Sequence, residues 1–450
     1  MPQSPALQYA CKNDFWFLPL GGTGEIGMNM NLYGHNKQWL MVDCGMGFLH
    51  EGNSEKRITA DPAFIEQQIE RLQAIVLTHA HEDHLGALVE LWPRLKVPVY
   101  ATSFAAELLL NKLSAVTWGH AVPIYTVPMQ SPQQIGDFEV TWLPMPHSIP
   151  EASSLLIETQ AAKVLHSGDW KMDANPVVGP SFNRALYGLL HSYELDALIC
   201  DATNATKSGH TLSESACYQG LYQAIAQAPQ RVVVSCFSSN IARLVTLAKI
   251  AKKTGRKMAL FGRSMETMVG IARRLGYWPN DLILIDPKHI GFLPAKEVLV
   301  VATGSQGEPR AALTKLSYQR HPWLYLEEGD RVIFSAIKIP PNKVRIEQLL
   351  ERLRRQKLDV IHAEEQKGTP LHASGHPSQD DLEQFLSLVH PKALIPTHGE
   401  AEHLQALAEL AQKQHIPTVM AGTNGDLFKI APFYKIEKHF AKTGSLEILS

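Results

Sequence analysis

Six consecutive positions, from His79 to His84, carry three histidines and two acids. They follow the apolar run at 74–77, which predicts a buried strand, so the loop presents its side chains at the carboxyl end of that strand. Imidazole nitrogens and carboxylate oxygens suit Zn²⁺, Mn²⁺ or Fe²⁺, and no thiolate is present. His79 and His81 can point to one side and Asp83 and His84 to another, which predicts two metal ions rather than one.

Three further candidate ligands follow apolar runs in the same way. They are His147 in LPMPHSIPE, Asp169 in VLHSGDW and His398 in LIPTHGE. Four residues cannot complete two metal sites, so these three are the expected remaining ligands. Glu82 stands between ligands and is expected to face solvent or to support the site from outside it.

The segments around these residues predict short strands early in the chain. Strands are expected at 15–20, 28–34, 38–45 and 74–77, with one helix at 63–72. From about residue 206 strands alternate with helices, which is typical of a parallel α/β sheet. Ser238 or Ser239 is the expected N-cap of a helix that starts near Asn240.

Short strands and loops return after about residue 355, with a helix expected at 380–389 and a strand ending at His398. The chain therefore reads as one domain interrupted by another, with predicted parts 1–205, 206–354 and 355–450. The charged run at 343–357 is expected to form the solvated face of a helix.

Composition narrows the class of protein. The 450 residues are 45% hydrophobic and carry a formal net charge of −2, so a large core is expected and no global basic field marks a nucleic-acid binder. Five cysteines without a CxxC pair argue against a disulfide framework. No signal peptide and no apolar run of about 18 residues is present, so we expect a cytoplasmic protein without a membrane partner.

One glycine motif is misleading. Gly22, Gly24 and Gly27 satisfy GxGxxG, with Asp43 downstream. A dinucleotide site needs this loop to open a helix, whereas MNMNLYG alternates like a strand. We expect a tight turn between strands.

The order HxHxDH, His, Asp and a distant His resembles the metallo-β-lactamase superfamily, and the interrupting segment resembles the β-CASP nucleases within it. The closest resemblance is to ribonuclease J, through the following motifs in order: GGTGEIGMNMNLY, HAHEDHLGAL, HSIPE, GDWKMD, DATN, FSSNIAR, FGRSM, ATGSQGEP, SGHPSQ and IPTHGE. The resemblance implies an α/β fold, namely a metallo-β-lactamase αββα sandwich interrupted by a β-CASP α/β domain with a parallel sheet.

The resemblance also assigns roles to the candidate ligands. His79, His81 and His147 would hold one divalent ion, most simply Zn²⁺ with Mn²⁺ as the alternative. Asp83, His84 and His398 would hold the second, Asp169 would bridge both, and Asp43 would orient a ligand from outside. A hydroxide between the ions would attack phosphorus in line, with Asp83 counted among the catalytic residues.

Outside the ligand set, the resemblance points to a catalytic pair. His376 in SGHPSQ would protonate the leaving oxygen, and Asp201 in DATN would orient it. Ser374 and Gly375 beside it would meet an RNA phosphate together with His376. Arg263 is expected to assist, and Phe48 to stack on a base.

The expected function is therefore a ribonuclease on single-stranded RNA, 5′-monophosphorylated, with 5′→3′ exonuclease and endonuclease modes. A DNA nuclease of the same family, a small-molecule hydrolase of the lactonase or thioesterase type and a non-catalytic RNA-binding subunit are the alternatives. The chain stops soon after NGDLF, so we expect a short form without the family's usual C-terminal domain, with a homodimer as the suggested assembly.

Overall fold

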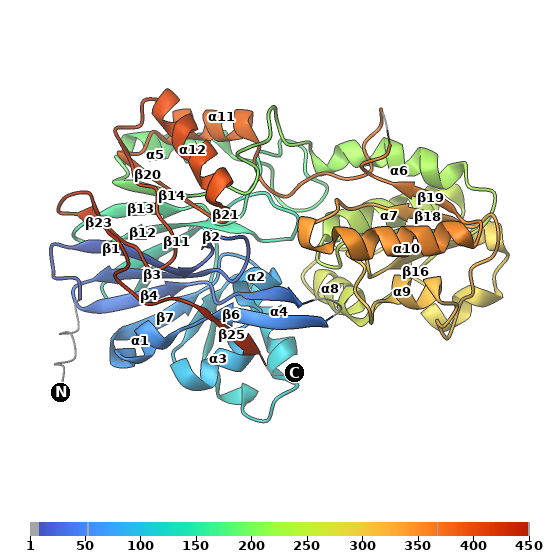
Figure 1. Ribbon diagram of the computed structural model, residues 1–450, viewed down its shortest axis with the longest axis horizontal. Coiled ribbons are helices and arrows are strands. Elements are labelled where there is room, and N and C mark those ends of the chain that lie inside the picture. Colours follow the sequence, from blue (N-terminus) through green and yellow to red (C-terminus); the bar gives the residue numbers. More distant parts are fainter. Residues whose placement is uncertain (1–8, 52–53, 367, 449–450) are drawn as a thin grey trace.

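Two β-sheets packed face to face form the larger lobe of the computed structural model, which describes residues 9–51, 54–366 and 368–448 (Figure 1). The first sheet has the order β24-β23-β1-β3-β4-β7-β8-β9, with bounds Lys435–Glu437, Leu427–Ala431, Phe15–Gly21, Met30–His35, Gln38–Val42, Leu72–Val76, Val99–Ala101 and Ile124–Thr126. The second has the order β10-β11-β12-β13-β14-β20-β22, with bounds Gln133–Ile135, Phe138–Pro144, Ser153–Glu158, Lys163–His166, Ala197–Asp201, Ala393–Thr397 and Thr418–Val419.

The alternation of side chains along the strands builds the layers. Phe15 and Phe17 of β1 face the second sheet, where they share a core with Trp142 and Ile199. The intervening Trp16 points to the outer layer of the first sheet. The outer helices are α1 (Ala63–Glu66), α3 (Leu88–Leu95) and α4 (Ser103–Leu113) on one side, and α5 (Arg184–Ser192), α11 (Gln379–Val389) and α12 (Ala401–Lys413) on the other. The predicted αββα sandwich is confirmed.

The smaller lobe is a parallel sheet inserted between β14 and β20 (Figure 1). Its order is β16-β17-β15-β18-β19, with bounds Lys257–Phe261, Val298–Ala302, Val232–Ser235, Arg331–Phe334 and Asp359–His362. Its helices are α6 (Cys217–Ala226), α7 (Ile241–Thr254), α8 (Arg263–Arg274), α9 (Ala312–Ser317) and α10 (Lys343–Arg355). The predicted boundary at 354 precedes β19, so we propose that the inserted domain runs through His362.

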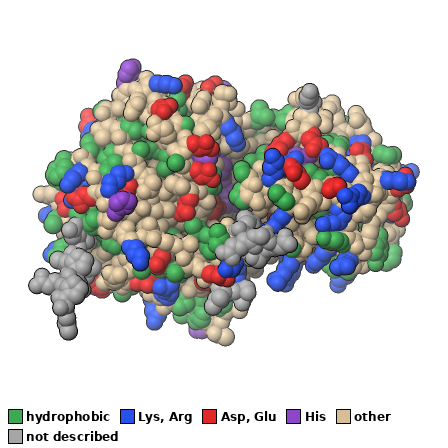
Figure 2. Space-filling view, viewed as in Figure 1, with side chains coloured by type: hydrophobic (Ala, Val, Ile, Leu, Met, Phe, Trp, Pro, Cys, Tyr) green, Lys and Arg blue, Asp and Glu red, His purple; other side chains and the backbone are tan. Residues whose placement is uncertain are grey.

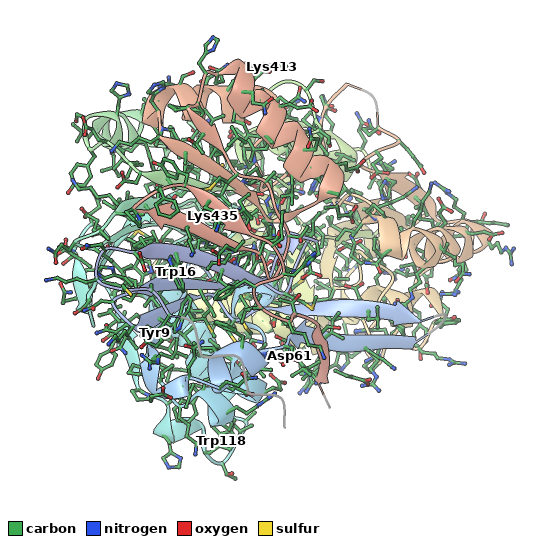
Figure 3. The ribbon with its side chains drawn as sticks, turned by 60° about the vertical axis from the view of Figure 1, so that its left-hand side comes forward. Tyr9, Trp16, Asp61, Trp118, Lys413 and Lys435 are labelled. Carbon is green, nitrogen blue, oxygen red and sulfur yellow. The ribbon has the colours of Figure 1, made fainter. Side chains whose placement is uncertain are left out.

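Small sheets complete the larger lobe. β5 (Met46–Glu51) and β6 (Ser54–Ala60) form a hairpin that extends toward the inserted lobe, and β25 (Ser445–Ile448) pairs with β6. The N–H of Asp61, directly after β6, donates to the carbonyl of Gly444 at 2.9 Å, which ties the end of the chain to this hairpin (Figure 3). β2 (Thr23–Gly24) pairs with β21 (Gly399–Glu400).

Local predictions fail where long-range contacts decide. The helix expected at 63–72 ends after Glu66, because Gln68 leaves helical geometry and its buried amide oxygen accepts from the indole of Trp39 at 3.1 Å. Asn240, rather than Ser238 or Ser239, caps α7 by accepting from the N–H of Arg243.

Strand ends also move. β3 begins at Met30, two residues after the predicted start, and β4 ends at Val42, so the strand expected at 38–45 is shorter. The GxGxxG segment forms a turn with positive φ at Gly22, Gly24 and Gly27, as predicted. Among the described residues, no helix is long and apolar enough to cross a bilayer.

Candidate metal centre and catalytic pair

The candidate ligands lie where strands of the two sheets end. His79 follows β7, His147 follows β11, Asp169 follows β13 and His398 follows β20. Because these strand ends meet at one edge of the sandwich, residues more than 300 positions apart come together. His81 caps α2 (Glu82–Leu85), a short helix that carries the next two ligands.

Three histidine nitrogens converge on one point. The Nδ1 of His81 lies 3.0 Å from the Nε2 of His79 and 3.1 Å from the Nε2 of His147. Two nitrogens bound to one tetrahedral zinc at ~2.0–2.1 Å would lie roughly 3.3 Å apart. The three rings therefore have the spacing of ligands around a single ion.

The second set converges beside the first. The Nε2 of His84 lies 3.6 Å from a carboxylate oxygen of Asp83, and the Nε2 of His398 lies 3.3 Å from the same oxygen. Asp169 borders both sets, because its Oδ2 lies 3.2 Å from the Nε2 of His84 and 3.8 Å from that of His79. The donor atoms of each group lie within 4.8 Å of one another.

Hydrogen bonds to the other ring nitrogens fix which atoms face the centre. The Nδ1 of His84 donates to Asp43 at 2.7 Å, and that of His147 donates to the carbonyl of Gly375 at 2.7 Å. Thr78 donates its hydroxyl to Asp43 at 2.8 Å, so it can only accept from the Nδ1 of His79, 3.0 Å away. Each of these rings then presents an Nε2 lone pair inward.

This arrangement fits a bound cation. The Nε2 atoms of His79 and His147 both lack a hydrogen and both face the Nδ1 of His81, so one hydrogen at most serves three nitrogens. Lone pairs that face one another repel unless a positive charge lies between them. The residues present therefore fit a divalent metal, and the His/Asp donor set suits zinc or manganese.

The electrostatics of the two sets differ. Burial lowers the pKa of His79 and His147 well below the usual range and that of His81 to about 4, so these rings are neutral and able to coordinate. Burial also acts on His84, but the carboxylates of Asp169, Asp83 and Asp43 outweigh it and raise its pKa well above the usual value.

Asp43 and His398 are held in an unusual backbone conformation. Their φ angles are +64° and +51°, in the left-handed region that residues with a Cβ rarely adopt. Asp43 also accepts the N–H of Thr78 at 2.9 Å, so its buried carboxylate receives three hydrogen bonds. The predicted supporting residue thus contacts the β7 loop and one ring of the second set.

His376 and Asp201 form a pair at the rim of the centre. The Nδ1 of His376 donates to Asp201 at 2.8 Å, and its ring lies 5.5 Å from that of His398 and 5.2 Å from that of His147. Burial lowers the pKa of His376, but the carboxylates of Asp201 and Asp169 outweigh it, so the pKa is raised. The Nε2 atom remains available to a substrate.

Ser374 and Gly375 lie directly beside this pair. Ser374 Oγ accepts from the amide of Asn204 at 2.8 Å and from the N–H of His376 at 3.3 Å, which leaves its own hydroxyl hydrogen to donate. A Cβ on Gly375 would lie 2.6 Å from the Cε1 of His147, so only glycine fits against that ring.

The remaining candidates lie on other elements. Arg263 is the exposed first residue of α8, and Phe48 lies on β5 with 49% of its surface exposed. Neither is among the residues that the structure gathers around the metal ligands. Glu82 forms an ion pair with Lys112 at 2.7 Å rather than joining either ligand set.

Sequence reasoning missed several supporting residues. Thr203 accepts from the Nδ1 of His398 at 2.8 Å and donates to its carbonyl, and Asn29 reaches the Nε2 of His84 at 3.2 Å. Thr203 lies within DATN, so that motif could have indicated it, whereas Thr78 and Asn29 carry no local signal of their long-range contacts.

The site opens into a cleft between the lobes. Figure 2 shows histidine and acidic side chains deep between the larger lobe and the inserted lobe. An extended polymer can pass between two such walls over the metal ligands.

Comparison with family models divides the chain into three matched segments. Residues 24–194 match the metallo-β-lactamase superfamily, 229–353 the β-CASP domain of ribonuclease J, and 369–421 the RNA specificity domain of zinc-dependent metallo-hydrolases. A crystal structure of a protein of unknown function from Enterococcus faecalis V583 has a TM-score of 0.62 over 92% of this chain and all of that one, at 16% identity, which shows a shared fold.

Curated relatives are closer in sequence. Ribonuclease J of Sinorhizobium meliloti is 40% identical over 92% of this chain and 74% of that protein. The Thermus thermophilus and Helicobacter pylori (strain B128) proteins of that name are each 34% identical over 92% of this chain, which spans 73% and 60% of their lengths. With the two ligand sets and the His376–Asp201 pair in place, these similarities establish that the chain belongs to the ribonuclease J family of β-CASP metallo-β-lactamases.

Proposed function

We propose that this chain, as a metal-dependent ribonuclease, hydrolyses phosphodiester bonds of single-stranded RNA at the two-metal centre. The observation that carries the proposal is the His376–Asp201 pair beside seven converging ligands. A hydrolase for uncharged small molecules needs the ligands but has no need for a second, carboxylate-held histidine.

The ligand roles follow from the geometry. We propose that His79, His81 and His147 hold one zinc ion, that Asp83, His84 and His398 hold the other, and that Asp169 contacts both, as listed in the ligand groups. When bound, the two ions would supply Lewis-acid polarisation of the phosphoryl oxygens and a nucleophilic water at neutral pH.

The chain's own residues handle the leaving group. Asp201 keeps a proton on the Nδ1 of His376 and raises its pKa, so the ring holds a second proton on Nε2 to a higher pH. That Nε2 proton passes to the departing ribose oxygen. Ser374 donates its free hydroxyl hydrogen to a phosphate oxygen and holds the backbone in place.

The same loop supports recognition of a 5′ end. We infer that Ser374, Gly375 and His376 receive the 5′-terminal monophosphate, which favours 5′→3′ exonuclease activity, while longer RNA lying through the cleft would be cut internally. Arg263, at the N-terminus of α8, would neutralise a backbone phosphate, and Phe48 would stack on a base.

A ligand substitution tests the metal assignment. His81→Ala should abolish RNA cleavage and lower the tightly bound metal below two ions per chain without unfolding the protein. His191→Ala, on the exposed face of α5, is the matched control and should behave as wild type. Undiminished cleavage by His81→Ala would exclude the proposed centre.

Product analysis tests the substrate. RNA labelled at either end, with 5′-monophosphate or 5′-triphosphate, is compared with DNA of the same sequence. Mononucleotides released only from the monophosphorylated RNA would establish the 5′ exonuclease mode. Equal cleavage of the DNA strand would contradict RNA specificity.

A further inference from the structure

A fully buried arginine lies where the inserted lobe joins the larger one. Arg243, in the first turn of α7, pairs through Nε and Nη2 with both carboxylate oxygens of Glu214 at 2.5 and 3.1 Å. Its Nη1 donates to the carbonyls of Ser335 at 3.1 Å and Leu371 at 2.9 Å, and it also contacts the Ser335 hydroxyl. A buried guanidinium is tolerated only when its donors are satisfied in this way.

These partners belong to the two segments that connect the lobes. Glu214 lies on the first crossing, between β14 and α6, and Leu371 lies on the second, between β19 and α11. The first crossing starts at Asp201 and the second carries His376. Arg243 therefore holds together, from the inserted lobe, the two segments that supply the catalytic pair.

The same network continues toward the metal ligands. The N–H of Glu214 donates to Asp173 at 3.1 Å, and Asp173 pairs with the buried ammonium of Lys171 at 3.4 Å. The N–H of Lys171 donates to the carbonyl of Pro146 at 2.9 Å, directly before His147. A continuous polar chain thus runs from α7 to the loops that carry Asp169 and His147.

The loop at 372–378 depends on this frame. The carbonyl of His376 accepts from Asn204 at 3.1 Å and from Thr211 at 2.7 Å, both on the first crossing. Upstream, the carbonyl of Leu371 is held by Arg243 and by the Ser335 hydroxyl at 2.6 Å. The distance between the two crossings, set by Arg243 and Glu214, therefore sets the place of His376.

We propose that Arg243 is a positioning residue, which keeps His376 aligned with Asp201 and the leaving oxygen by joining the two interlobe crossings. The inference rests on the proposed role of His376 as the acid of RNA cleavage. Lysine cannot replace the guanidinium, since one ammonium cannot satisfy two carboxylate oxygens and two carbonyls at once.

The test compares two substrates. RNA has a poor leaving group that needs a proton, whereas bis(p-nitrophenyl) phosphate releases a stable phenolate that does not. Arg243→Lys should lower kcat on RNA roughly 10- to 100-fold, with KM and the rate on the nitrophenyl ester little changed. Arg256→Lys is the matched control, because Arg256 is buried and bonds only to carbonyls of the inserted lobe, at 228, 230 and 298.

His376→Ala separates the two proposals. It should show the same selective loss on RNA. If it does, while Arg243→Lys lowers both substrates in parallel or neither, positioning by Arg243 is overturned and the acid role stands. If His376→Ala itself lowers both rates equally, the acid role is overturned, and the positioning proposal with it.

A milder variant covers the case in which Arg243→Lys does not fold. Ser335→Ala removes one donor to the Leu371 carbonyl and should give a smaller selective loss on RNA. Ser317→Ala removes a buried hydroxyl that donates to Thr314 within α9, far from both crossings, and should leave both rates unchanged. Equal behaviour of the two serine variants would overturn the proposal.

Discussion

Asp43→Asn is the sharpest test of how the metal ligands are held. The carboxylate is fully buried and accepts three hydrogen bonds, two from Thr78 and one from the Nδ1 of His84. Asparagine keeps the volume but replaces one acceptor oxygen with a donor. If its oxygen stays on the N–H of Thr78, its amide group faces His84.

His84 must then change tautomer. Its Nδ1 would accept from the amide, and its hydrogen would move to Nε2, the atom that faces Asp169 at 3.2 Å. Removing that hydrogen before metal can bind, and losing a bond to a charged acceptor, costs about 1.5–3 kcal/mol, or roughly 10- to 100-fold in affinity. The loss should fall on the second metal alone.

Zinc titration of the stripped protein against a chelating indicator measures this. Wild type should bind two ions tightly, and Asp43→Asn should bind one of them roughly 10- to 100-fold more weakly. Asp330→Asn is the control, because Asp330 is equally buried and accepts from Arg231 and Glu327 in the inserted lobe. Wild-type affinity for both ions in Asp43→Asn would refute the reasoning.

Three further predictions follow from contacts described above. Asp201→Asn should lower kcat on RNA by about 10²- to 10⁴-fold, with a smaller loss on bis(p-nitrophenyl) phosphate; equal losses on the two substrates would contradict the acid role of His376. Gly375→Ala should lower metal content and cut activity by about 100-fold or more, since its Cβ would meet the His147 ring at 2.6 Å; metal analysis and circular dichroism distinguish this from unfolding. Burial, and secondarily a nearby lysine, lowers the pKa of His321 to about 4, so the unfolded chain binds a proton there that the folded chain does not, and stability falls as pH drops from about 6.5 to 4. His321→Asn should reduce that acid sensitivity by about 2 kcal/mol after solvent screening in urea unfolding at pH 7 and pH 5, and an unchanged pH slope would contradict it.

The sequence predicted the site better than its surroundings. The ligand types stand directly after apolar strands, and parallel strands must place their carboxyl ends at one edge, so local pattern carries the long-range arrangement. The buried face of α10, with Ile346, Leu349 and Leu353, likewise follows from spacing alone, and its exposed charges confirm the predicted solvated face.

Contacts between distant segments could not be predicted. Arg243 follows FSSN and looks like an ordinary helix residue, because its partners lie 29, 92 and 128 positions away. The helix at 63–72 failed for a similar reason, since a single buried bond from Trp39 to Gln68 outweighed its apolar spacing. Domain limits and phosphate contacts remain predictions.

The left-handed backbone at Asp43 and His398 has a consequence for engineering. A non-glycine residue in this conformation costs roughly 1 kcal/mol or more, which the surrounding bonds must offset. Glycine at either position would relieve that cost, so a screen for thermostability alone would tend to accept substitutions that remove a metal ligand or its support. Selection for heat resistance in this chain therefore needs a simultaneous selection for catalysis, since at these two positions the most comfortable backbone belongs to an inactive enzyme.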